Sequence, residues 1–136
     1  MSMNLCVENI CSLAADKMSR YKDMLDISYM QHVFICDDNA TRLLSNIELR
    51  QKVMEEIDEI DRQIADSDDR ENPEYLGMEQ EIVGIQKEIA RQDRLNEIAA
   101  RNKILEYSNT IKKNSNARKS FAYVSAATYS VSEYAE

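Results

Sequence analysis

A run of isoleucine, leucine and charged residues at helical spacing extends from Met78 to about Ile111, and it contains one glycine and no proline. An uninterrupted pattern of this length predicts a single long α-helix. Two shorter stretches of the same kind precede it, at about Asn4–Phe34 and about Asn39–Ala65. The chain is therefore expected to build its fold from three long helices.

The composition supports an all-α fold. The 136 residues include only 2 Gly and 1 Pro, so the chain has few residues with which to make turns. β-Sandwiches and β-barrels, which need many turns, are excluded on this ground. Short connections place sequential helices side by side in opposite directions. We therefore predict an antiparallel three-helix bundle over residues 1–116, with an extended third helix, and a weakly structured tail over residues 117–136.

Each segment carries an apolar stripe in steps of three and four residues, which is typical of helices packed against other helices. In the third segment, which starts near Pro73, polar Gln92 and Asn96 fall where apolar residues are expected. Such an interruption either fixes the register of the helices or marks the end of the bundle. The stripe of the first segment is Val7, Cys11, Ala14, Met18, Tyr21 and Leu25, widened by Ile10, Leu13, Met24, Ile27 and Met30.

The predicted helix lengths differ. At 1.5 Å per residue the first two helices are about 40–45 Å long and the third, which ends near Lys113, is about 60 Å. The excess predicts an exposed, mildly basic helix end near residues 103–116. Its candidate partner-binding residues are Ile104, Leu105, Tyr107, Ile111, Lys112 and Lys113. Alternatively, the tail folds back over this end or a second copy covers it, as in a homodimer.

The tail adds aromatic residues, of which Phe121 and Tyr123 come first. Aromatic side chains in a segment rich in small residues are good anchors for a partner's groove. A tail without a role is the alternative reading.

The net charge of −8 is unevenly distributed. Residues 48–74 carry eleven acidic and four basic side chains, whereas residues 94–119 carry two acidic and seven basic ones. The acidic block argues against nucleic acid as a partner, while the basic block could steer an acidic protein. Solvated helix faces are the simpler explanation of both blocks.

The sequence predicts a cytoplasmic protein without a membrane partner. The first ten residues lack the pattern of a secretory signal, and no apolar run reaches the roughly 20 residues that span a bilayer. Three cysteines, Cys6, Cys11 and Cys36, are expected to be reduced thiols.

No enzyme motif stands out, and no cofactor or metal is expected. The two glycines cannot form a phosphate-binding loop, and the single histidine cannot supply a di-metal helical bundle. His32 and Cys36 could share a helix face, but they lack the paired close spacings of a closed zinc site.

Three stretches carry a resemblance to a known family. Residues 38–61 read DNATRLLSNIELRQKVMEEIDEID, residues 89–113 read IARQDRLNEIAARNKILEYSNTIKK with an Asp-x-x-Asn step at Asp93 and Asn96, and residues 116–125 read NARKSFAYVS. Together they resemble the second helix, the long third helix and the start of the tail of bacterial flagellar export chaperones of the FlgN/FliT type.

The resemblance implies a cytosolic chaperone that uses no ATP. Such a protein binds the helical ends of late flagellar subunits, the hook-associated or filament-cap proteins, prevents their premature assembly and passes them to the export gate. It implies partner contacts at Ile98, Leu105, Ile111, Phe121 and Tyr123. The alternative function is a self-assembling coiled-coil scaffold or adaptor without a client, which would cover the same surface with its own copies.

Overall fold

The computed structural model describes the backbone of residues 9–135 and the side chains of residues 9–121. Within this range the chain forms three α-helices and no strand: α2 (Ile10–Cys36), α3 (Ala40–Ala65) and α4 (Pro73–Ala135). The predicted all-α class is confirmed. The chain forms two compact units, and the boundary between them lies within α4, between Ala100 and Arg101.

Asparagine side chains start all three helices. The Oδ1 atoms of Asn9 and Asn39 accept hydrogen bonds from the backbone N–H groups of Cys11 and Arg42. Asn72 accepts from the N–H groups of Glu74 and Tyr75, with a proline at the first helical position after it. These caps satisfy backbone donors that the first turn leaves without a partner, so they fix where each helix begins.

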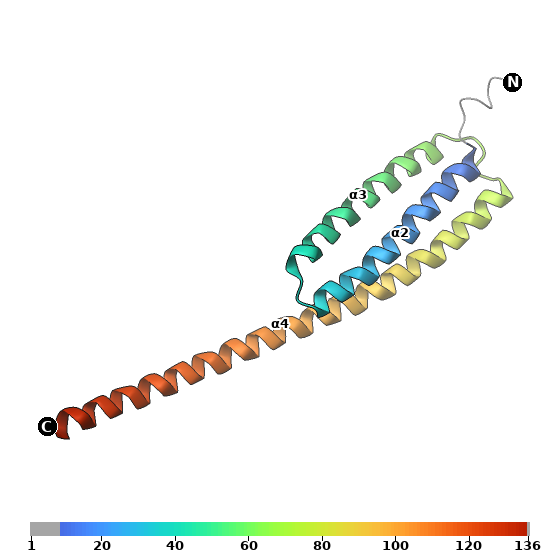
Figure 1. Cartoon of the computed structure of the whole chain (residues 1–136). Coiled ribbons are helices and arrows are strands. Elements are labelled where there is room, and N and C mark those ends of the chain that lie inside the picture. The colour runs from blue at the N-terminus through green and yellow to red at the C-terminus, as the bar shows by residue number, and fades with distance from the viewer. Residues whose placement is uncertain (1–8, 136) are drawn as a thin grey trace. The chain divides into compact units, whose positions relative to one another are not determined.

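The first unit is the three-helix bundle (Figure 1), in which α2, α3 and the first part of α4 run side by side. Side chains of α2 meet those of α3 in opposite chain order and those of α4 in the same order. For example, Lys17 contacts Glu79, and Ser28 contacts Asp93. The bundle therefore runs up, down and up. Its core has two apolar clusters, Ile10, Leu13, Ala14, Ile64 and Tyr75, and Met24, Ile27, Val53, Ile57 and Ile89.

The buried face of α2 differs from the predicted stripe. Ala14 is buried, but Cys11, Met18, Tyr21 and Leu25 are only half-buried, and Met30 is 44% exposed. The residues at the centre are Ile10, Leu13, Met24 and Ile27, which the sequence pattern placed at its margin. Because α2 packs against two helices at once, its buried face is broader than one coiled-coil seam. Val7, also in the predicted stripe, lies outside the described residues.

The third helix is much longer than its neighbours and continues past its predicted end. It has 63 residues, whereas α2 has 27 and α3 has 26. Asn114-Ser115-Asn116, which follows the end predicted near Lys113, does not interrupt the helix. No glycine or proline follows Gly84, and asparagine and serine lower helix stability only slightly. Residues 117–135, the predicted tail, therefore belong to α4.

Candidate protein-binding surface

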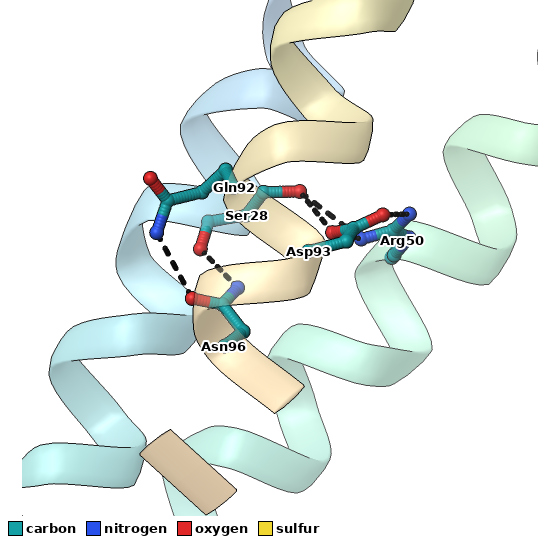
Figure 2. Close-up of polar contacts among 5 residues, drawn as sticks. All are labelled: Ser28, Arg50, Gln92, Asp93 and Asn96. Atoms are coloured by element: carbon teal, nitrogen blue, oxygen red, sulfur yellow. Dashed lines mark hydrogen bonds and ion pairs between the residues drawn. The ribbon is translucent and has the colours of Figure 1, made fainter. Parts of the chain in front are cut away.

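Two groups of polar side chains join the three helices of the bundle unit. The first, which we call the polar layer, consists of Ser28, Arg50, Gln92, Asp93 and Asn96 (Figure 2). The Arg50 guanidinium donates to both carboxylate oxygens of Asp93, each at 2.7 Å. Ser28 Oγ, on α2, donates to Asp93 Oδ1 at 3.1 Å. A single carboxylate thus connects α2, α3 and α4.

Asn96, on α4, completes the polar layer through a hydrogen bond to the backbone of α2. Its Nδ2 donates to the backbone oxygen of Ser28 at 2.8 Å, and its Oδ1 accepts from Gln92 at 3.0 Å. Asn96 is only 4% exposed, so the polar interruption read from the sequence lies inside the bundle and does not mark its end. Because a buried amide needs specific partners, this layer fixes how α2 and α4 align.

The charges of the polar layer stabilise each other. The hydrogen bonds from Arg50 hold the pKa of Asp93 below its usual range, against the opposing effect of burial. The same hydrogen bonds raise the pKa of Arg50 further. Ser28 is fully buried, and its hydroxyl contacts Asp93 and Arg50, so a substrate has no access to it. The arrangement serves to pair helices.

Lys17 forms the second such group. Its Nζ lies 2.8 Å from Asp61 Oδ1 and 3.2 Å from Glu79 Oε1, and the residue is 9% exposed. Burial alone would lower the pKa of Lys17, but the hydrogen bonds and charges of Asp61 and Glu79 outweigh it and raise the pKa. The two groups, near opposite ends of the bundle, account for polar residues within otherwise apolar stripes.

The second unit presents apolar side chains to solvent. Ile104 is 66% exposed, Tyr107 52% and Ile111 67%, and no side chain between residues 101 and 121 is buried. Their spacing of three and four residues places them on one side of the helix. The same spacing continues through Asn114, Arg118 and Phe121, all exposed. We call these six residues the exposed seam.

Not all the predicted partner-binding residues lie on this seam. At about 100° per residue, Leu105 is about 150° from the centre of the six-residue seam, and Lys112 and Lys113 are each about 130° from it, on opposite sides. All three are exposed, Leu105 by 60%. Ile98, 49% exposed, belongs to the bundle unit, and the side chain of Tyr123 lies outside the described ones.

Asn114 and Arg118 are the residues of the seam that were not among the predicted candidates, and Arg118 is the charged one of the two. It follows Ile111 by seven residues and Ile104 by fourteen, so it occupies the same line along the helix. This spacing of seven residues was visible in the sequence. It was overlooked because the predicted helix ended before Arg118.

Neither a metal site nor a membrane-spanning helix is found in the part of the chain that the structure describes. No three histidine, cysteine or acidic side chains among residues 9–121 are grouped as a metal site would need. His32 Nδ1 instead lies 3.1 Å from Asn96 Oδ1. Among the described helices, none has the length and apolar character required to cross a membrane. The candidate protein-binding surface is the exposed seam, where large apolar side chains are 52–74% exposed along one helix.

Comparison of the sequence with protein-family models and with curated proteins, and of the structure with solved structures, finds no match.

Proposed function

We propose that this protein holds a helical segment of another protein on the exposed seam. The observation that carries the proposal is the exposure of Ile104, Tyr107 and Ile111 in a line along one helix. An exposed apolar stripe on a helix is the kind of surface on which a second amphipathic helix packs. Catalysis is not part of this proposal.

The energetics suit reversible binding. Burying an isoleucine or an aromatic side chain contributes roughly 1.5–3 kcal/mol, so Ile104, Tyr107, Ile111 and Phe121 together supply roughly 6–12 kcal/mol. Association costs at least about 4 kcal/mol in lost freedom of motion. At this lower limit of the cost, the balance gives binding of moderate affinity, which suits a protein that must release its client.

The resemblance to flagellar export chaperones of the FlgN/FliT type gives the proposal a specific form. The protein would act in the cytoplasm, bind the helical end of a hook-associated or filament-cap protein, prevent its premature assembly and deliver it to the export gate. Among the residues that carry the resemblance, Arg50, Asp93 and Asn96 form the polar layer. These three residues hold the helices of the bundle together. The proposed contacts with the client lie on the exposed seam instead.

The proposal predicts a complex between the purified chain and a hook-associated or cap protein of the same organism. Size-exclusion chromatography with light scattering measures the masses of both species. We expect the free chain to be monomeric or weakly dimeric and to form a complex of defined stoichiometry with one of these proteins. A tight dimer or tetramer that survives dilution and binds none of them would instead support the self-assembling scaffold.

A further inference from the structure

The position of Arg118 restricts which helices can occupy the exposed seam. A partner helix that covers Ile104, Tyr107 and Ile111 and continues along the same line must also cover Arg118. Arg118 is exposed in the structure, so its charge is hydrated in the free chain. Covering a guanidinium without an opposite charge is unfavourable, whereas a carboxylate can bind it through two parallel hydrogen bonds. The seam therefore favours a partner with an acidic residue at this point.

The surrounding charges act in the same direction. Residues 101–121 contain six basic side chains and one acidic one, a net charge of +5. Lys103 lies next to the seam and forms an ion pair with Glu106 at 3.6 Å. Arg101 and Lys119 lie about a quarter of a turn from the seam on its other side. Glu106 lies at a similar angle on the side of Lys103, but it is one acidic side chain against six basic ones, so the potential that a partner meets is positive.

The same charges disfavour a second copy of this helix as the partner. Two parallel copies in register would place Arg118 against Arg118, and any pairing of residues 101–121 with themselves brings net charges of +5 together. Like charges at seam positions select against such a pairing. The charges therefore favour a helix whose sequence differs from residues 101–121.

We propose that the partner is an acidic amphipathic helix that places a carboxylate opposite Arg118. This inference rests on the proposed function, since it names the chemistry of the client held on the exposed seam. It identifies Arg118 as the residue that selects among helical clients, while Ile104, Tyr107 and Ile111 supply affinity for any apolar stripe.

Synthetic helical peptides test this inference with the full chain. Each fluorescent peptide has an apolar stripe flanked by glutamate, and it carries either glutamate or lysine at one position of the stripe. Two versions of each peptide place this position near the N-terminal or the C-terminal end, so that both parallel and antiparallel pairing of the peptide with α4 are tested. In fluorescence anisotropy we expect the glutamate peptide to bind about tenfold more tightly than the lysine peptide. Arg118→Glu should reverse this preference, and Lys113→Glu, on the far side of the helix, should keep it.

The outcomes separate this inference from the proposed function. Equal binding of both peptides by the unmodified chain would overturn the selection by Arg118 but leave helix binding in place. Failure of every helical peptide to bind would overturn both. Tighter binding to phosphatidylserine vesicles than to any peptide would assign the basic residues to a lipid surface and also overturn the inference.

Discussion

Replacing Ile104 and Ile111 together by aspartate is expected to weaken binding of a helical client by more than about a hundredfold. Each isoleucine contributes roughly 1.5–3 kcal/mol when it is buried, and about 1.4 kcal/mol corresponds to a factor of ten. The two side chains are 66% and 67% exposed in the free chain, so their loss removes little folding energy. The melting temperature should therefore stay within about 2 °C of the original. Isothermal titration with the client and thermal unfolding followed by circular dichroism measure both effects.

Leu105→Asp is the matched control for this experiment. Leu105 is also an exposed aliphatic residue of α4, at 60%, but it lies away from the exposed seam. We expect its replacement to change client affinity by less than about threefold, because the side chain does not face the bound helix. If Leu105→Asp weakened binding as much as the double variant, the seam would be wrongly placed on the helix. A large fall in the melting temperature of the double variant would show that the two isoleucines belong to a folded core.

Replacing Asp93 by asparagine is expected to destabilise the bundle by about 1–2 kcal/mol at pH 7. The variant keeps the shape of the side chain but leaves Arg50, whose side chain is 24% exposed, without its opposite charge. Hydrogen bonds between charged groups contribute about 1.5–3 kcal/mol, and the 36% exposure of the Asp93 side chain reduces this through solvent screening. Urea unfolding of the two proteins measures the difference.

The same variant should change how stability depends on pH. The pKa of Asp93 is lower in the folded chain than in the unfolded one, so the unfolded chain takes up its proton first on acidification. The stabilisation by Asp93 is therefore complete above the unfolded pKa, near 4, and is lost as the pH falls through the lower folded pKa. The difference between the original chain and Asp93→Asn should accordingly shrink between pH 5 and pH 2.

Glu81→Gln provides the control for charge, since it removes a carboxylate from an exposed position of the same helix. It should change the free energy of unfolding by less than about 0.5 kcal/mol. An equal effect of Glu81→Gln and Asp93→Asn would mean that net charge, and not the polar layer, governs the stability of the bundle.

The starts of the second and third helices could be predicted because they depend on local chemistry, whereas the first, expected at about Asn4, begins at Ile10. Asn72 followed by a proline, and Asn39 after two aspartates, are cap signals that act within a few residues. The end of α4 could not be placed in the same way. After Gly84 the chain has no residue that forces a helix to stop, and the propensities of asparagine and serine are too weak to decide.

The polar layer shows where periodicity alone falls short. The pattern identified Asn96 as a polar residue in an apolar stripe, but two readings remained open. Only the arrangement of three helices shows that the Asn96 amide reaches the backbone of Ser28, 68 residues earlier. The choice of partners for a buried polar group depends on distant segments, which a pattern within one helix does not contain.

The exposed surface was predictable from helix lengths, but its face was not. A third helix longer than its neighbours indicated uncovered apolar residues, and Ile104, Tyr107 and Ile111 are exposed. Leu105 was included because of its place in this helix end and because of the family resemblance, and Lys112 because of its place in the helix end, although neighbouring residues of a helix point about 100° apart. Following the seam in steps of three and four would have led to Arg118. Whether these residues bind a partner stays a prediction.

Amide hydrogen exchange of α4, measured by mass spectrometry with and without the client, tests the central claim most directly. Helices owe most of their stability to packing, and no side chain between residues 101 and 121 is buried. These amides should therefore exchange faster than those of residues 75–100 in the free chain and become protected when the client binds. Strong protection of residues 101–121 in the free chain, or client-induced protection confined to α2 and α3, would contradict the proposal that the exposed seam is the binding surface.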